Sequence, residues 1–201
     1  MMKRRTVPAL VVALALCLGL TACNGAESPA PSQASDEPQT QTTSQDQEST
    51  KSSAAAEKRV ARDDADIQTE DATMPTRIPA EDGTKINMYF GDTVIPGVLN
   101  NSETAKALIE KLPVTQHVSR YSHDFCGTTE ELPYNEDEVH YGWLNGDIDY
   151  ATDAPYFTIL FEDEDVSEQY GYQVNIGVIT CPLETIAGLE GSFDVRIELA
   201  E

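Results

Sequence analysis

Cysteine is the most reactive side chain in this sequence. Two of the four cysteines lie before residue 24, and the other two, Cys126 and Cys181, lie in the part of the chain that contains the aromatic residues. A thiol becomes a nucleophile where a neighbouring base or cation lowers its pKa. His117 and His123 could in principle activate Cys126, but no residue in the sequence is placed to orient either imidazole, so we do not predict a nucleophilic centre.

The N-terminal stretch indicates a covalent modification at Cys23. Three basic residues precede an apolar run of 12 residues, 9–20, which is shorter than the roughly 20 residues that a membrane-spanning helix needs. Leu-Thr-Ala-Cys then follows at 20–23, and such small residues before a cysteine are typical of a bacterial lipobox, whose thiol takes fatty acyl chains such as palmitate. We expect a signal peptide at residues 1–22 and a lipid anchor on Cys23, on the extracytoplasmic face of the cell membrane. An ordinary secretory signal cut near Ala22 is the alternative.

Export would also bear on Cys126 and Cys181. Two cysteines of one domain can pair in an oxidising compartment, and their separation of 55 residues would stabilise the fold by roughly 4 kcal/mol in the chain-entropy account. Spacing alone does not establish the geometry of a disulfide. Two separate buried thiols are therefore the alternative to a pair.

The acidic and histidine residues do not form a metal-binding pattern. The acidic runs at 136–138 and 162–165 lack the alternating ligands, central glycine and terminal glutamate of a calcium loop. The three histidines show no His-x-x-x-His spacing, and the sequence has no Cys-x-x-Cys, G-x-S-x-G or phosphate-binding glycine loop. We therefore expect solvated loop charge, no metal and no cofactor.

Tyrosines and the one tryptophan offer a candidate binding surface. Tyr and Trp are enriched where proteins bind ligands, but they are also common in ordinary β-strands. We take Tyr141, Trp143 and Tyr150 as candidates for a groove that binds a peptide or a small ligand, with strand packing as the alternative.

Charge and composition divide the chain. The sequence has 13 Lys and Arg against 35 Asp and Glu, a net charge of −22, which argues against nucleic acid and against an anionic lipid surface as partners. All aromatic residues lie at or after Tyr89, and residues 24–82 contain only three Val, Ile or Leu. Such a segment buries too little apolar surface to fold. We predict a lipidated cysteine and disordered acidic linker at 23–82 and a folded domain at 83–201.

Hydrophobic periodicity in the domain is mostly that of β-strands. An apolar stripe of Ala105, Leu108, Ile109 and Leu112, capped by Asn101 or Ser102, predicts one clear helix that Pro113 ends. Residues 125–135 and the acidic segment 162–168 read as loops, and 182–188 reads as a short helix. Period-two alternation predicts strands at 85–90, 93–99, 114–122, 138–143, 147–151, 156–161, 172–180 and 193–199, with a turn at Asn145-Gly146.

This number of strands in so short a domain favours a mainly β fold, either a closed barrel or a sandwich. Closure is the better answer because it leaves no edge strand exposed.

The order of these elements resembles the bacterial cyclophilin-like domain family. The residues that carry the resemblance are the strand and turn at Ile86–Asp92, and the helix with the pattern T-A-x-A-x-x-x-x-L-P at 104–113. Residues 146–150, 156–161 and 176–179 follow in the family's order. The resemblance implies a closed cyclophilin-like β-barrel of about eight strands with one or two capping helices.

The resemblance also implies where an activity would lie. Cyclophilins isomerise X-Pro bonds with an arginine, an aromatic proline pocket and a nearby glutamine and histidine. Arg120, Gln116 and His117 are the weak candidates here, because the cyclophilin pattern around the arginine does not occur and Arg120 could equally be a surface residue paired with an acid.

Together these features favour a membrane-anchored extracytoplasmic lipoprotein whose domain is a non-catalytic module that binds a ligand or peptide. A peptidyl-prolyl cis-trans isomerase acting on envelope or secreted proteins is the alternative.

Overall fold

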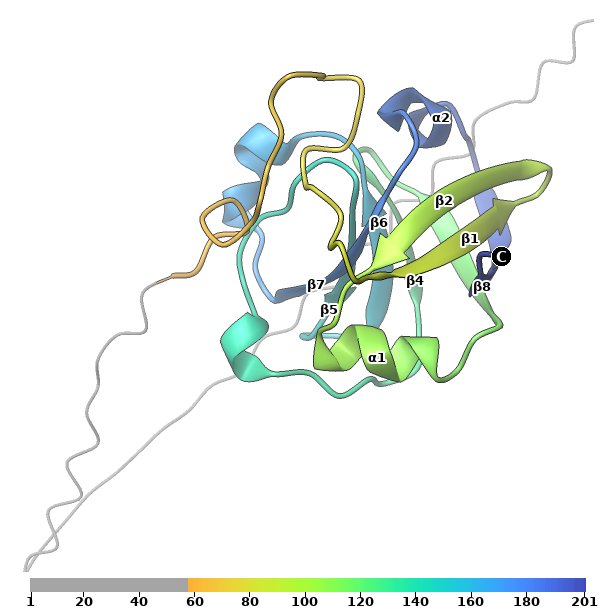
Figure 1. Cartoon of the computed structure of the whole chain (residues 1–201), viewed down its shortest axis with the longest axis horizontal. Helices are drawn as coiled ribbons and strands as arrows, with labels where there is room; N and C mark the ends of the chain where they lie inside the picture. Colours follow the sequence, from red (N-terminus) through yellow and green to blue (C-terminus); the bar gives the residue numbers. More distant parts are fainter. Residues whose placement is uncertain (1–57) are drawn as a thin grey trace, which may run out of the picture. The chain divides into compact units, whose positions relative to one another are not determined.

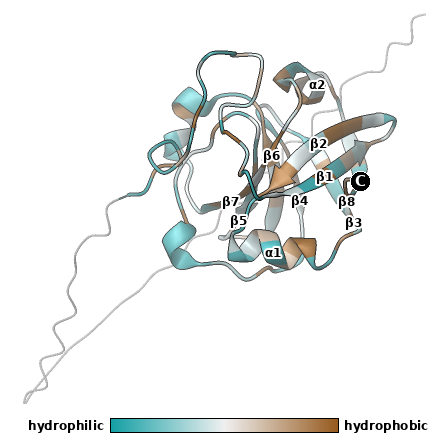
Figure 2. Ribbon diagram, viewed as in Figure 1, coloured by the Kyte–Doolittle hydropathy of each residue, from teal (hydrophilic) through white to brown (hydrophobic). Residues whose placement is uncertain are grey.

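Alternating burial builds the first hairpin. In β1 (Thr84–Phe90) and β2 (Thr93–Leu99) every second side chain from the third onward is buried, as period two requires when one face of a sheet covers a core. Gly91 lies between them with φ +59°, a conformation that glycine adopts without strain. Figure 2 shows the resulting bands of hydrophobic and hydrophilic residues along both strands.

The structure, a computed structural model, describes residues 58–201, and the strands of this part close into a barrel (Figure 1). The order around the barrel is β1-β2-β7-β5-β6-β4-β3-β8, and β8 pairs with β1. Every pair of neighbouring strands is antiparallel. The remaining strands are β3 (Val114–Arg120), β4 (Asp124–Thr128), β5 (Asp147–Ala151), β6 (Tyr156–Leu160), β7 (Gln173–Ile179) and β8 (Ser192–Leu199).

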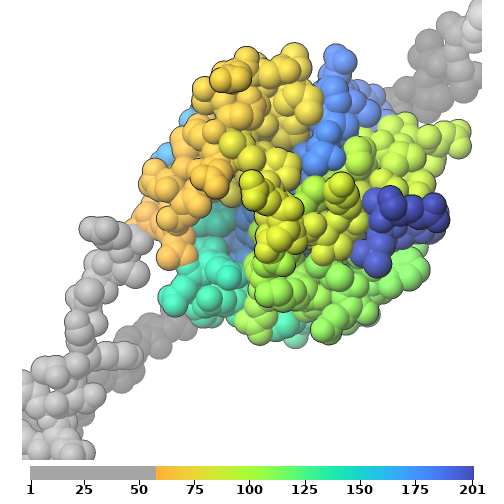
Figure 3. Space-filling model, viewed as in Figure 1, coloured from red at the N-terminus to blue at the C-terminus, as the bar shows by residue number. Residues whose placement is uncertain are grey.

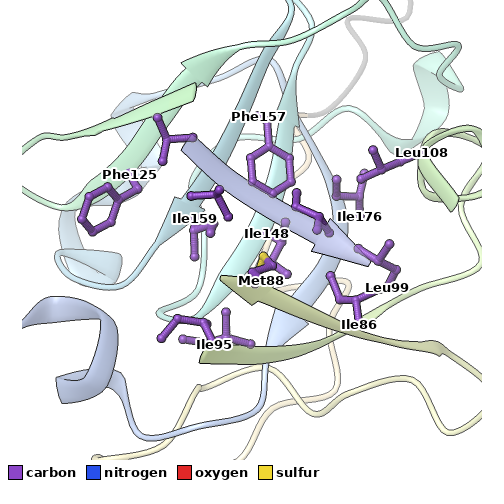
Figure 4. Packing of buried hydrophobic residues seen from close by; sticks show 14 of the residues in the cluster. Ile86, Met88, Ile95, Leu99, Leu108, Phe125, Ile148, Phe157, Ile159 and Ile176 are labelled. Atoms are coloured by element: carbon purple, nitrogen blue, oxygen red, sulfur yellow. The ribbon is translucent and has the colours of Figure 1, made fainter. Parts of the chain in front are cut away.

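Apolar side chains fill the inside of the barrel. Figure 4 shows aliphatic side chains from β1, β2, β5 and β7 meeting the rings of Phe125 and Phe157. Ile148, Ile159 and Met88 are completely buried. The interior is therefore a packed core.

Two short α-helices accompany the barrel. In α1 (Glu103–Ile109) the Ser102 side chain accepts a hydrogen bond from the Ala105 amide, which confirms the predicted cap. Ala105 and Leu108 are buried against the core. The second helix is α2 (Leu183–Ala187), and two 3-10 helices, η1 (Glu136–Glu138) and η2 (Glu164–Gln169), lie in the loops. The predicted fold class, a closed eight-stranded barrel with one or two helices, is confirmed.

One predicted loop is a strand. Residues 124–128 form β4, which joins β3 to β6 and is needed to close the barrel. A segment that contains Gly127, Pro133 and acidic residues is typical of a loop, but the glycine has a different role here. A Cβ on Gly127 would lie 1.8 Å from the His117 carbonyl oxygen, so the glycine is required by the close approach of β3.

One predicted strand is not a strand. Residues 138–143 form only isolated bridges, with His140 opposite Gln173 and Tyr141 opposite Val60. The turn at Gly146 therefore does not close a hairpin, and β5 pairs with β6 and β7 instead.

Residues 58–82, which we expected to belong to the disordered linker, are packed on the barrel, and we call them the strap. The Ala61 amide donates to the Tyr141 carbonyl at 2.9 Å, and the Tyr141 amide donates to the Arg59 carbonyl at 3.0 Å. Further along, the Thr76 amide donates to the Asn145 carbonyl at 2.9 Å. Figure 3 shows the strap, orange to yellow, lying over one side of the domain.

The expected start of the domain at residue 83 is thus wrong. A low count of apolar residues does not exclude folding here, because the strap uses a core that the barrel already provides. Backbone hydrogen bonds and an ion pair between Arg77 and Asp147 hold it there.

The signal peptide at 1–22, the lipid anchor on Cys23 and the linker up to residue 57 lie outside the described residues. Within residues 58–201 no helix is long and apolar enough to cross a membrane.

We predict that Arg77→Ala lowers the free energy of unfolding by about 3–5 kcal/mol, because it leaves the fully buried Asp147 without its cation. Urea denaturation of the two proteins measures the difference. Arg62→Ala is the matched control, since Arg62 lies in the same strap, is about half exposed and pairs with Glu164, so its loss should cost about 1 kcal/mol or less. Equal losses in both variants would contradict a special role for Arg77.

Candidate functional site

Two carboxylates on β5 point away from the barrel core. Ile148 and Tyr150 belong to the core cluster, so the alternation of the strand places Asp147 and Asp149 on its outer face. Both are nevertheless completely buried. Their burial requires a cover outside the barrel wall, and the strap forms part of that cover.

Arg77 of the strap neutralises the first carboxylate. Its Nε donates to Asp147 Oδ1 at 2.6 Å and its Nη2 donates to Oδ2 at 2.8 Å, which is a bidentate pair. Asp147 Oδ2 also accepts from the Leu144 amide at 2.9 Å. Burial alone would lower the pKa of Arg77, but its hydrogen bonds to Asp147 and the negative charge of Asp147 raise it.

Asp149 has no cation of its own. Its Oδ1 accepts from Asn175 Nδ2 at 2.9 Å, while Oδ2 has no hydrogen-bond partner. Burial and then the neighbouring charge of Asp147 raise the pKa of Asp149 to about 8, against the opposing effects of Arg77 and Asn175. The two carboxyl groups therefore differ: Asp147 is paired with Arg77, whereas burial favours the neutral form of Asp149.

An amide chain continues from Asp149 to α1. Asn100 Nδ2 donates to the Asn175 carbonyl at 2.8 Å and to Asn175 Oδ1 at 3.1 Å. Asn100 Oδ1 accepts from the Ser102 amide at 3.0 Å, just before the helix begins. The start of α1 is thus held to β7 and β5.

His140 lies next to this group and is only 6 % exposed. Its Nδ1 is 3.1 Å from the Gly142 carbonyl, and because a carbonyl only accepts, Nδ1 carries the hydrogen. Burial lowers the pKa of His140 and outweighs the opposing effect of Asp147, so the ring is neutral at pH 7. Nε2 is then an acceptor, and it has no hydrogen-bond partner.

A pocket of about 530 Å³ lies over these residues, and we call it the strap pocket. It is lined by strap residues, by the turn that leads into α1, by Glu138 and His140, and by Asn175. The strap contributes Arg59, Ala61, Asp64 and Arg77, and the turn contributes Asn100, Asn101 and Ser102. In the part of the chain that the structure describes, no three His, Cys, Asp or Glu side chains are grouped to hold a metal ion.

The structure does not bring the isomerase candidates together. Gln116 and Arg120 are four residues apart on β3, about 13 Å at the usual rise per residue, and Gln116 Nε2 donates to Thr129 Oγ1 at 2.7 Å. His117 points to the other face, where it is exposed and lies 2.8 Å from Asp194 Oδ1.

Arg120 lies over aromatic rings, although these are part of the core. Its guanidinium is 4.8 Å from the centroid of Phe161 and 5.9 Å from that of Phe125. Both rings are almost completely buried, so they do not form an open proline pocket beside the arginine.

The three aromatic candidates lie in different environments. Tyr150 is in the core and its hydroxyl oxygen accepts from the Leu132 amide. Trp143 is 3 % exposed and its Nε1 donates to the Glu162 carbonyl at 2.9 Å. Only Tyr141 is partly exposed, and the Lys58 ammonium of the strap lies 4.5 Å from its ring centroid. They do not form one groove.

Cys126 and Cys181 are both free thiols in the structure, so the disulfide left open by their spacing is not formed. Burial and then the charge of Asp124 raise the pKa of Cys126 to about 12, and burial also raises the pKa of Cys181. The raised pKa values disfavour the thiolate, which is the nucleophilic form, in both cysteines.

The residues of the strap pocket were missed in the sequence because their partners are far apart along the chain. One signal was present: Asp147 and Asp149 alternate with Ile148 and Tyr150 in a strand, where aspartate is uncommon. Two acids on one face of a strand require either water or a partner.

We predict that Asp149→Asn raises the free energy of unfolding relative to the wild type, and that the difference grows between about pH 4 and pH 8. Asp149 keeps its proton in the folded chain up to about pH 8 but loses it near pH 3.9 when unfolded, so the wild type loses stability as the pH rises through this range. Each unit of pKa corresponds to about 1.4 kcal/mol, so the difference should reach a few kcal/mol. Urea denaturation at several pH values measures it, with the exposed Asp153→Asn as control. A difference independent of pH would show that Asp149 is ionised.

Comparison with known proteins identifies the family of the barrel. A family model described as the cyclophilin-like family matches residues 88–198, which is more than half of the chain and runs from β1 into β8. No curated protein matches the sequence. The solution structure of a hypothetical protein from Archaeoglobus fulgidus is 19 % identical, covers 60 % of this chain and 99 % of its own, and aligns with a TM-score of 0.48. On the strength of the family match, and in agreement with the resemblance seen in the sequence, the chain belongs to the cyclophilin-like family.

Proposed function

We propose that this chain is a non-catalytic binding module, anchored to the extracytoplasmic face of the cell membrane by a lipid on Cys23. Its ligand is a small molecule or a segment of peptide that enters the strap pocket. The observation that carries the proposal is His140, a neutral and almost fully buried side chain at the pocket whose Nε2 has no partner. A buried polar atom without a partner costs stability, and such an atom at a pocket indicates that a ligand can satisfy it.

Binding is favoured over catalysis by the placement of the titratable groups. Asp149, the neutral acid, is completely buried and is absent from the lining of the pocket, so it cannot exchange a proton with a bound substrate. Ser122 Oγ and Asp163 Oδ2 both approach the same nitrogen of His123, Nδ1, so these three residues do not form a relay.

The anchor is supported by the sequence before Cys23 and by the charge of the domain. Residues 58–201 contain nine Lys and Arg against 29 Asp and Glu. A domain with this charge is repelled from an anionic membrane surface. A covalent lipid would therefore be needed to hold it at the membrane.

Pocket binding is tested by melting the full chain, in a non-ionic detergent, with acetylated tripeptide amides whose central residue is lysine, aspartate or asparagine. We expect at least one to raise Tm in proportion to its concentration. Asn101→Trp should abolish that rise, because Asn101 is exposed and lines the pocket, where an indole would occupy the space. If no peptide raises Tm, or if those that do act equally on the tryptophan variant, the strap pocket is not the binding site.

The anchor is tested by growth of the producing bacterium with an alkyne-labelled palmitate. We expect the wild-type chain to carry the label and to sediment with membranes. Cys23→Ala should lose both the label and the sedimentation, because the lipobox no longer has a thiol to accept the lipid. An unlabelled wild-type chain, or a labelled variant, would contradict the proposed anchor.

Prolyl isomerisation is the second candidate, and the position of Arg120 over Phe125 and Phe161 is the observation that favours it. A protease-coupled assay with succinyl-Ala-Ala-Pro-Phe-4-nitroanilide separates the two functions. We expect no acceleration over the uncatalysed rate, because the aromatic rings are closed to a substrate. Acceleration that is lost in Arg120→Ala would establish the isomerase instead.

A further inference from the structure

We propose that the strap pocket recognises an organic cation with N–H donors, either a primary ammonium or a guanidinium group. This inference rests on the proposed function and adds the chemical class of the ligand. Its basis is the hydrogen-bonding capacity that the residues around the pocket leave unused.

The unused groups beside the pocket are acceptors. His140 Nε2 and Glu138 Oε2 have no hydrogen-bond partner, and both residues line the pocket. A third unpartnered acceptor, Gln173 Oε1, belongs to the residue that pairs with His140. His140 and Gln173 exchange both backbone hydrogen bonds, so their side chains lie on the same face. A ligand that satisfies these three acceptor atoms must donate hydrogen bonds.

Three donor side chains of the pocket have partners in this chain. Arg77 donates two hydrogen bonds to the carboxylate of Asp147, and the side-chain amide of Asn100 donates to Asn175. Arg59 Nε lies 3.0 Å from Asp64 Oδ2. An anionic ligand would have to compete with these acids for the two arginines.

The charge balance also favours a cation. The two arginines in the lining are each paired with an aspartate, whereas none of the ion pairs formed within residues 58–201 includes Glu138. One carboxylate is thus left without a countercharge. The excess of acids over the whole domain adds a general attraction for cations.

The pocket can admit such a group from the side of the strap. Glu138 Oε2 and His140 Nε2 are both buried and have no hydrogen-bond partner. Arg59 and Asp64 line the pocket, and their side chains are 43 % and 60 % exposed. Exposed side chains of this kind change rotamer readily, so a ligand can move them aside without unfolding the strap.

Calorimetric titration of the full chain, in a non-ionic detergent and 150 mM salt, tests the inference with two cation sources. One probe is n-butylammonium, a free amine, and the other is acetyl-Gly-Lys-Gly-amide, a lysine side chain on a peptide. Acetyl-Gly-norleucine-Gly-amide has a similar apolar stem without the ammonium. We expect one or both cations to bind, and the norleucine peptide to bind at least tenfold more weakly than the lysine peptide or not at all.

Glu138→Gln should weaken binding of the cation at least tenfold, because the substitution removes the unpaired carboxylate but preserves the shape of the side chain. Glu136→Gln is the matched control: it lies in the same 3-10 helix, is exposed, loses the same charge and does not line the pocket. The Glu136→Gln variant should bind the cation with an affinity within twofold of that of the wild type. Equal weakening in both variants would show that only the overall negative charge of the domain attracts the cation, which would overturn the inference. Unchanged binding in Glu138→Gln would overturn it as well.

A second measurement applies if Glu138→Gln fails to fold. The imidazole proton resonances of His140 in the wild-type chain should shift on titration with the lysine peptide and not with the norleucine peptide, and a shift with both or with neither overturns the inference. If the aspartate or asparagine peptide binds in a manner that Asn101→Trp abolishes, while no cation binds, the ligand class is wrong and the binding function stands. If neither n-butylammonium nor any of the peptides binds, the proposed function itself fails.

Discussion

The bidentate ion pair between Arg77 and Asp147 joins the strap to the barrel wall. Removing two charges from water costs free energy, and their attraction offsets this cost only where the geometry is good and the remaining lone pairs accept hydrogen bonds. Both conditions hold here, since two parallel hydrogen bonds link the side chains and the Leu144 amide donates to the same carboxylate. With this pair in place, the outer face of β5 can be covered, and the strap pocket has its floor and one of its walls.

Burial and a neighbouring carboxylate both disfavour the charged form of a carboxyl group that has no cation of its own. The structure has one arginine for two acids, and Asp149 is therefore the neutral member. The asparagines at positions 175 and 100 then extend a polar chain toward α1. This layer lies outside the apolar core, so the outer wall of the barrel carries a site that the fold alone does not imply.

Much of the barrel was predictable because one face of most strands is buried. The regular alternation of β1, β2 and β8 and the apolar stripe of α1 are direct consequences of burying one side of an element. The failures have different causes. In β4, a glycine allows two backbones to approach, and a sequence does not distinguish such a glycine from one in a loop. In the strap, amino-acid composition carries no information about backbone hydrogen bonds to a core that other residues form.

The site was less predictable than the fold, because its members come together only after the barrel closes. Arg77 and Asp147 are 70 residues apart, and no spacing rule connects an arginine in a polar segment to an aspartate in a strand. The family resemblance directed attention to Arg120, Gln116 and His117, which β3 places on different faces and at different heights. The unpaired acceptors of His140 and Glu138 are properties of the folded chain alone.

The position of the strap determines where the independently stable unit begins. A fragment cut at Gly83, the boundary that composition suggests, would lack Arg77 and every backbone bond between the strap and the barrel. Its outer wall would then present two aspartates to water, together with the bare side of the turn at Gly146, where Pro75 now packs. A recombinant fragment of this domain should therefore begin at or before Lys58.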